Sequence, residues 1–128
     1  MIHQVSDVVA MAFMSLFPEM RGDEHWDKLC SWVGAGKKTP MLHIGVFDNG
    51  LVGLFPCEAY EDRLMIHACF LPGFRGDFAV ESAKEAFKWI WNNTEYGKIT
   101  AYIEPEHVKR YAKRCGMVES GGFFEVSR

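Results

Sequence analysis

The sequence has no excess of basic residues and none of the short motifs that mark metal or nucleotide sites. With 14 Lys and Arg against 17 Asp and Glu, the 128 residues carry a net charge of −3, which gives no basic field to recruit nucleic acid. The five histidines and four cysteines form no HExxH, CxxC or Cys/His zinc spacing, so no metal site is expected. Lys37–Lys38 follows glycine without the rest of a Walker motif, which favours a solvated basic turn.

Long apolar runs are also missing. No uninterrupted run approaches the roughly 18 residues that a membrane-spanning helix needs, and the first residues lack the regions of a signal peptide. The cysteines are scattered in mostly apolar surroundings and are interpreted as reduced core residues of a cytosolic protein. These absences predict one domain over residues 1–128, located in the cytoplasm, with neither a membrane nor a nucleic acid as partner.

Regular alternation of helix and strand signals is present along the whole chain. The predicted helices cover residues 5–17, 24–34, 77–91 and 105–115, and the predicted strands cover 1–4, 41–47, 51–59, 64–71, 98–103 and two short pieces within 117–126. Turn signals stand at 21–24, at Asp48–Asn49–Gly50 and at Gly121–Gly122. The first helix is expected to be one-sided, with its stripe on Val5, Val8, Val9, Ala12, Phe13, Leu16 and Phe17.

The order of these elements predicts the fold class. Strands 41–47, 51–59 and 64–71 form an antiparallel meander, whereas strand 98–103 arrives after a crossover helix and is expected to run parallel to strand 64–71. The chain is therefore predicted to be a single α/β domain. Its sheet is mixed and mostly antiparallel, with helices on both faces and a central parallel strand pair.

The stretch Leu64–Val80 combines a strand, a glycine-containing turn and the start of a helix. Amides at a helix start are unpaired donors, and the helix dipole adds roughly half a positive charge there. Such a strand–turn–helix unit is a generic site for an anion. The residues alone leave open whether it binds a phosphate or only turns the chain.

Two segments carry a resemblance to a known family. The first, LMIHACFLPGFRGDFAVESAKEAFKWI, resembles the acetyl-CoA motif of the GCN5-related N-acetyltransferase (GNAT) superfamily, in which a strand leads into Q/R-x-x-G-x-G/A. The second, YIEPEHVKRYAKRCGM, is similar to that family's late strand and the helix after it. The resemblance covers nearly the whole chain. The small size and the LP-x-[FY]-R-G phrase also resemble small GNAT-like proteins encoded by tailed phages.

The resemblance implies acetyl-CoA as the cofactor. Its pyrophosphate is expected on the amides at the helix start, and its pantetheine arm in a splay between strands 64–71 and 98–103. The implied cofactor-binding residues are Phe70, Leu71, Arg75, Gly76, Asp77, Phe78 and Ala79. No metal-binding residue is implied.

The sequence departs from the family pattern at several of these positions. Aligned from Arg75, the family's central glycine falls on Phe78, whose bulk is expected to obstruct a close backbone approach. Asp77 brings negative charge toward a phosphate site. Counted back from Gly116, the asparagine that is frequent in the family falls on Pro105. The tyrosine that often serves the family as general acid falls on Ala112.

The candidate catalytic residues are Glu104, His67 and Tyr111. His67 and Glu104 each also suit a purely structural role, and Tyr111 does not align with the family's tyrosine. His67 is expected beside the splay, and an imidazole titrates near neutrality, but a core histidine with a backbone partner is the favoured interpretation. Glu104, a candidate base, also suits a helix cap, and Tyr111 is one residue away from the family's tyrosine. Glu58 is a further candidate base.

Two functions follow from these observations. One is an acetyl-CoA-dependent N-acetyltransferase that acts on a small-molecule amine or a protein, with a homodimer left open. The other is a catalytically inactive GNAT-like phage protein that acts in virion assembly or binds a host protein, in the host cytoplasm or the virion. The second rests on the losses at Phe78 and Ala112 and on Met11, Met14 and Trp32 as expected surface residues.

Overall fold

The computed structural model describes residues 1–21 and 24–128. The predicted turn at 21–24 includes Gly22 and Asp23, which lie outside the described residues. The helices and 3₁₀ turns are α1 (Asp7–Met14), η1 (Pro18–Met20), α2 (Glu24–Gly34), η2 (Pro72–Phe74), α3 (Asp77–Asn93) and α4 (Glu106–Arg114). The strands are β1 (Ile2–Gln4), β2 (Leu42–Phe47), β3 (Leu51–Tyr60), β4 (Arg63–Ile66), β5 (Cys69–Phe70), β6 (Lys98–Tyr102), β7 (Val118–Ser120) and β8 (Phe123–Ser127).

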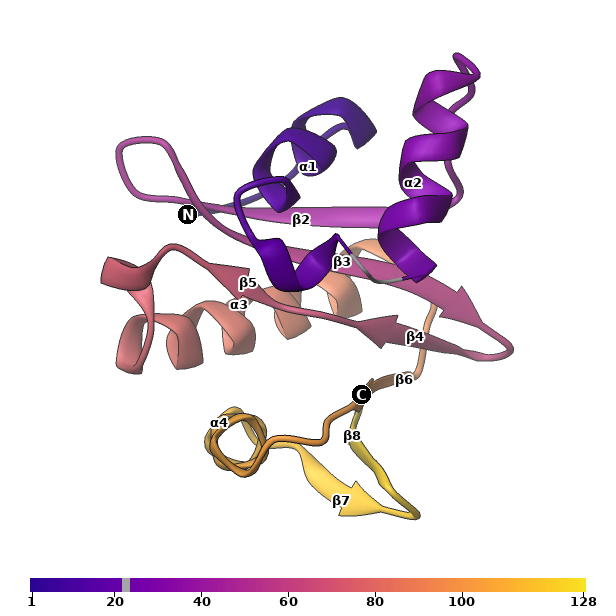
Figure 1. Cartoon of the computed structure of the whole chain (residues 1–128). Coiled ribbons are helices and arrows are strands. Elements are labelled where there is room, and N and C mark those ends of the chain that lie inside the picture. Colours follow the sequence, from indigo (N-terminus) through magenta and orange to yellow (C-terminus); the bar gives the residue numbers. More distant parts are fainter. Residues whose placement is uncertain (22–23) are drawn as a thin grey trace.

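All the strands join one sheet in the order β1-β2-β3-β4-β6-β8-β7, with β5 paired to β3. Every pairing is antiparallel except that of β4 with β6, which is parallel. The predicted mixed α/β sheet with a central parallel pair is therefore confirmed. In Figure 1, α1 and α2 lie near β2 and β3, whereas β6, β7, β8 and α4 lie at the opposite end of the molecule.

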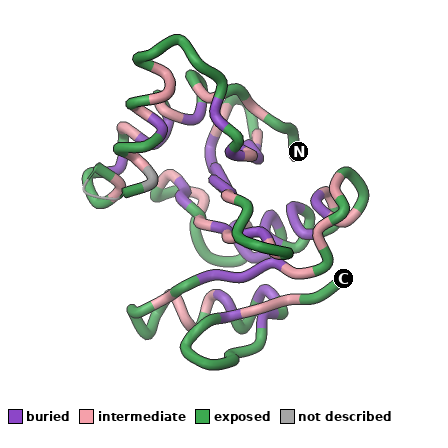
Figure 2. Tube along the Cα trace, turned by 90° about the vertical axis from the view of Figure 1, so that its right-hand side faces the viewer, coloured by how far each residue is buried: buried purple, intermediate pink, exposed green. Residues whose placement is uncertain are grey.

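Two hydrophobic clusters lie on opposite faces of the sheet. One contains the inward side chains of α3 and α4 together with Ile44, Val46 and Phe55. The other contains α1 and α2 with Leu54 and Cys69. Adjacent strand residues belong to different clusters because side chains alternate across a strand. Figure 2 shows the buried stretches along the central strands and the inner sides of the helices.

The first helix buries a different stripe from the predicted one. Ala10, Phe13, Met14 and Phe17 are buried, whereas Val8, Val9 and Leu16 are exposed and Ala12 faces solvent with them. The helix is apolar almost all round, so the sequence pattern does not single out the inward face. Met14, expected at the surface, is fully buried, and Met11 and Trp32 are half-buried.

The predicted strand 64–71 is interrupted. It forms β4 and β5, which pair with β3 in one continuous antiparallel register, with a gap at His67–Ala68. The gap faces Pro56, whose carbonyl oxygen accepts a hydrogen bond from the His67 amide nitrogen at 2.9 Å. Proline has no N–H to return to the His67 carbonyl, so the ladder is broken there.

Among the helices of the described residues, none is long and apolar enough to cross a membrane. Three of the four cysteines, Cys57, Cys69 and Cys115, are buried as predicted, and Cys30 is half-buried. All four are free thiols.

Candidate functional site

A pocket of about 180 Å³ opens where the parallel strands separate. Leu64 pairs with Ile99 and Met65 with Thr100, but β4 ends one residue later and the chain turns toward β3. The diverging segments leave a gap lined by residues 66–68 on one side and 101–103 on the other. Helices α3 and α4 close the pocket from behind through Ala83, Phe87, Val108, Tyr111, Ala112 and Cys115. The walls are mainly apolar, which suits a narrow, largely uncharged chain.

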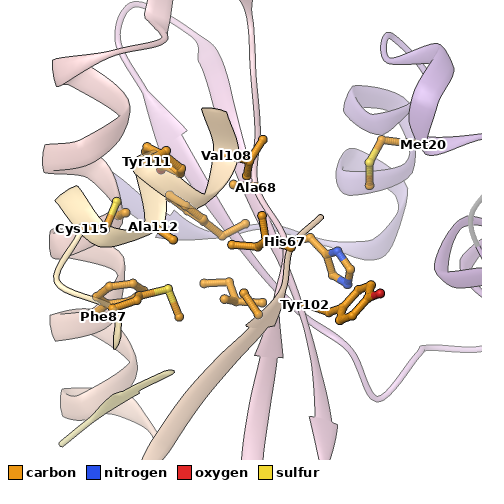
Figure 3. Close-up of a pocket in the computed structure, with 15 residues that line it drawn as sticks. Met20, His67, Ala68, Phe87, Tyr102, Val108, Tyr111, Ala112 and Cys115 are labelled. Carbon is orange, nitrogen blue, oxygen red and sulfur yellow. The ribbon is translucent and has the colours of Figure 1, made fainter. Parts of the chain in front are cut away.

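Tyr111 and Cys115 lie one turn apart on α4 and both line the pocket (Figure 3). The Tyr111 hydroxyl donates to the Ala79 carbonyl at 2.9 Å. Burial raises the pKa of Tyr111, and burial also raises the pKa of the Cys115 thiol to about 11. Both groups therefore keep their protons at neutral pH. The predicted Tyr111 does reach the pocket, with its hydroxyl held against the first turn of α3.

The mouth of the pocket is formed by His67 and Tyr102, whose rings lie beside each other in Figure 3. His67 is half-buried rather than part of the core. The Tyr102 hydroxyl donates to Glu104 Oε1 at 2.7 Å, and this hydrogen bond raises the pKa of Tyr102. Tyr102, which the sequence analysis did not select, thus lines the pocket together with His67 and hydrogen-bonds the predicted Glu104.

The alternation of side chains along β6 indicates on which face of the sheet Tyr102 lies. Ile99 and Ala101 of β6 are buried against the helices, so Tyr102 must point to the other face, where β6 ends. Glu104 is exposed and is not part of the pocket lining. Glu58, the remaining candidate base, is ion-paired to Lys28 of α2. The pair fixes Glu58 away from the pocket lining.

The start of α3 has the backbone shape expected of an anion site. Gly76, the residue before the helix, has φ +81° and ψ −134°, a conformation that strains any residue with a Cβ. As the N-cap residue, Gly76 has no side chain that could cap the first amides of the helix. Asp77 forms an ion pair with Arg114 of α4, which offsets the carboxylate charge near this helix start.

The Phe78 ring packs edge-to-face against two other rings. Its centroid lies 5.4 Å from that of Phe74 and 6.4 Å from that of Phe70. Arg75 Nε donates to the Phe70 carbonyl at 3.1 Å, which ties the loop to β5. Leu71 continues the pairing through its amide, which donates to the Val52 carbonyl at 3.0 Å. The bulky side chain at the family's glycine position is therefore engaged in the loop's own aromatic contacts.

A second pocket, of about 590 Å³, lies between the end of β1, the start of α1 and the 36–41 loop. Its lining includes Asp7 and His43, and Lys37 and Lys38 lie at its edge and are exposed. Asp7 accepts hydrogen bonds from the Thr39 amide and hydroxyl and contacts His43 Nε2 at 2.7 Å. Within the described residues, no group of three or more His, Cys, Asp and Glu side chains is arranged to hold a metal ion.

Residues 36–120 match the family described as "Protein of unknown function (DUF2824)". The chain belongs to this family. A relative, "Putative protein p31" of Acyrthosiphon pisum secondary endosymbiont phage 1, is 34% identical over 68 residues. That match covers 52% of this chain and 44% of the phage protein, so it spans less than half of the phage protein's length.

Solved structures are similar in fold at low sequence identity. A mutant form of spermidine N-acetyltransferase SpeG from Vibrio cholerae superposes with a TM-score of 0.76 at 14% identity, over 99% of this chain and 94% of that chain. Ribosomal-protein-alanine N-acetyltransferase from Brucella melitensis gives 0.72 at 10% identity, over 100% and 99%. The predicted GNAT-like fold is therefore confirmed. The family assignment to DUF2824 rests on the sequence match. The similarity to GNAT enzymes is a similarity of fold and rests on the solved structures.

Proposed function

We propose that the DUF2824 chain binds acetyl-CoA and transfers its acetyl group to an amine. The observation that carries this proposal is the combination of a strand splay, a narrow apolar pocket and an uncapped helix start preceded by Gly76. The N-acetyltransferase names of the structural neighbours support it. Fold alone does not fix function, so the proposal depends on these site features.

The residues present fit the cofactor. The amides of Gly76, Asp77, Phe78 and Ala79 bind the pyrophosphate, with Arg75 adding charge. Phe70 and Leu71 border the arm at the end of β5. Because the Phe78 ring is held by Phe70 and Phe74, its backbone amide remains the group that meets the phosphate.

Acetyl-CoA supplies an acetyl group activated as a thioester. With acetyl-CoA bound in the pocket, His67 at the mouth would accept the proton that an acceptor amine gives up on acetylation. Glu104 is a positioning residue at this mouth, because its carboxylate accepts the hydrogen bond from the Tyr102 hydroxyl. Tyr111, which lines the pocket, would be the donor of the proton that the thiol product needs. Its raised pKa makes it a weak acid, and it must first release the Ala79 carbonyl.

Calorimetric titration of acetyl-CoA into the protein tests the proposal, followed by thiol release with a panel of amines. Arg75→Glu is expected to weaken binding at least about tenfold, because it reverses the charge beside the pyrophosphate. Lys88→Glu is the matched control, since Lys88 is exposed further along α3. Absence of binding at millimolar acetyl-CoA contradicts the proposal.

The second candidate is a GNAT-like phage protein without catalysis, acting in virion assembly or on a host protein. The phage relative favours it, as do Phe78 and Ala112 at positions where the family resemblance implies glycine and tyrosine. Thiol release with any amine, dependent on His67, excludes this second function.

A further inference from the structure

The second pocket lies in the N-terminal region, away from the strand splay. Its volume of about 590 Å³ is within the range of roughly 300–1,000 Å³ that is usual for sites that bind small molecules. Its lining comes from the end of β1, the start of α1, the last turn of α2, the 36–41 loop and β2. Among the described residues, the linings of the two pockets have no member in common. The second pocket is therefore separate from the one proposed to bind acetyl-CoA.

The charged groups of this lining are one carboxylate, on Asp7, and two ammonium groups, on Lys37 and Lys38. The carboxylate is already occupied by the protein. Its Oδ2 accepts from the Thr39 amide at 2.8 Å, and its Oδ1 lies 2.6 Å from the Thr39 hydroxyl and 2.7 Å from His43 Nε2. Lys37 and Lys38 are exposed, and neither forms an ion pair with another described residue. The pocket therefore has positive charge that the described part of the chain does not neutralise.

Aliphatic side chains form another part of the same lining: Val5, Val8, Val33 and Met41. Met41 is buried and Val8 is 59% exposed, so the aliphatic wall runs from the core to the surface. An aliphatic group that packs on this wall is removed from water, which is favourable in proportion to the apolar area buried. An inorganic ion has no such area. The lining therefore suits a ligand that has both a negative charge and an aliphatic part.

We propose that the second pocket binds a small organic acid, in which one carboxylate is attached to an aliphatic body. The carboxylate is bound by the ammonium groups of Lys37 and Lys38, and the body packs on the four aliphatic side chains. Hydrogen bonds between ammonium and carboxylate groups are charge-assisted and therefore among the stronger ones in proteins. A cationic ligand does not fit, because Asp7 is held by Thr39 and His43. The site uses none of the residues proposed for acetyl transfer.

Amide NMR spectra of the isotope-labelled protein without acetyl-CoA test the proposal in three titrations at one ionic strength. The probes are octanoate, octylammonium and inorganic phosphate. Octylammonium has the aliphatic body with the opposite charge, and phosphate has negative charge without a body. Octanoate is expected to shift the amide signals of residues 4–8 and 33–43. It should bind at least about tenfold more tightly than either other probe, because only octanoate meets both the ammonium groups and the aliphatic wall.

Charge reversal identifies the residues that bind the carboxylate. The double variant Lys37→Glu/Lys38→Glu is expected to weaken octanoate binding at least about tenfold. The matched control is Lys88→Glu/Lys113→Glu, which makes the same change in net charge at exposed positions on α3 and α4. The control should bind octanoate as the wild type does. The amide spectrum of each variant also shows whether it folds like the wild type.

Several outcomes overturn the inference. Octylammonium or phosphate that binds as tightly as octanoate does so, because either the charge or the aliphatic body then makes no difference. Octanoate that shifts the signals of residues 66–68 and 101–103 instead occupies the first pocket. Equal octanoate affinity of the wild type and the Lys37→Glu/Lys38→Glu variant, or no octanoate binding at millimolar concentration, also contradicts it. Failure of acetyl-CoA to bind is a separate result that bears only on the proposed function.

Discussion

Two histidines on the same face of the sheet have opposite surroundings. His43 in β2 lies under α1 and is 2% exposed, with Nε2 on an Asp7 carboxylate that Thr39 also holds. His67 follows β4, where the strand ladder is broken, and lies half-exposed at a pocket mouth. The N-terminal region therefore uses its histidine to join α1, the 36–41 loop and β2. In the splayed region His67 instead lines a pocket and is half-buried.

The difference follows from what each strand pairs with. β2 is paired on both sides, to β1 and β3, and a helix covers it, so a polar residue there must find partners within the protein. The segment after β4 meets Pro56 on one side and the diverging β6 on the other. The predictions below separate a structural role in the first region from a chemical role in the second.

The largest expected effect is on stability, from Asp7→Ala. Removing this carboxylate leaves the buried Thr39 hydroxyl and His43 Nε2 without their acceptor, which should cost about 3 kcal/mol of unfolding free energy. Urea denaturation measures the change, and acetyl-CoA affinity of the folded protein should stay the same. Asp62→Ala, which removes an exposed carboxylate, should cost less than about 0.5 kcal/mol.

This contribution has a defined pH dependence. Burial opposes ionisation of Asp7, but hydrogen bonds from Thr39 and His43 outweigh burial and lower its pKa from the ordinary 3.8. The carboxylate therefore stabilises the fold fully above that value and loses its contribution as the pH falls through the lowered folded pKa. The stability gap between wild type and Asp7→Ala should narrow below about pH 3.8. A gap that widens there contradicts the assignment.

The next largest effect is on rate, from His67→Gln. Loss of a general base is expected to lower kcat by about a hundredfold or more, with the unfolding free energy nearly unchanged. Thiol release with a peptide amine measures the rate. His107→Gln, on the exposed side of α4, is the matched control. A large stability loss with unaltered kcat would instead make His67 a structural residue like His43.

A smaller effect is expected at the helix start. Gly76→Ala forces a Cβ onto a residue at φ +81°, so the loop must shift and acetyl-CoA affinity should fall about tenfold. Gly73→Ala is the control in the same loop, because no atom lies within 4 Å of its added Cβ. Calorimetric titration compares the two variants. Equal affinities would show that the Gly76 conformation does not contribute to the cofactor site.

The smallest effect is expected from Tyr102→Phe. The ring keeps its contact with Phe123 while the hydrogen bond to Glu104 is lost, so kcat should fall about threefold and the KM for the amine should change little. Glu104→Gln should give a similar decrease, since Glu104 acts through the same bond. Tyr60→Phe, another exposed tyrosine, serves as control. Effects that add in the double variant would show that the two residues act independently.

Local signals predicted much of the fold. The alternation in residues 41–47 and the Asp48–Asn49–Gly50 turn gave β2 and its hairpin because strand period and positive-φ residues are local properties. The crossover helix predicted the parallel pair for the same reason. The break at His67–Ala68 depends on Pro56 in the neighbouring strand, which no local pattern reveals. The inward face of α1 was also decided by packing rather than by its nearly uniform apolar sequence.

The positions of two predicted site residues follow from local patterns in part. His67 and Tyr111 both line the pocket, although the strand predicted over 64–71 is interrupted at His67; their roles in a reaction stay predictions. Tyr102 is the last residue of β6 and follows the strand alternation, but its contact with Glu104 could not be predicted because Glu104 lies beyond the strand, where the alternation no longer applies. The role of Phe78 was also out of reach from sequence. Its contacts with Phe70 and Phe74 depend on how η2 folds back on β5.

A crystal structure of the protein with coenzyme A tests the central claim most directly. The account predicts the pyrophosphate on the amides of residues 76–79, the pantetheine arm between β4 and β6, and the Phe78 ring still against Phe70 and Phe74. Coenzyme A bound elsewhere, or no coenzyme A in crystals soaked at millimolar concentration, would contradict it.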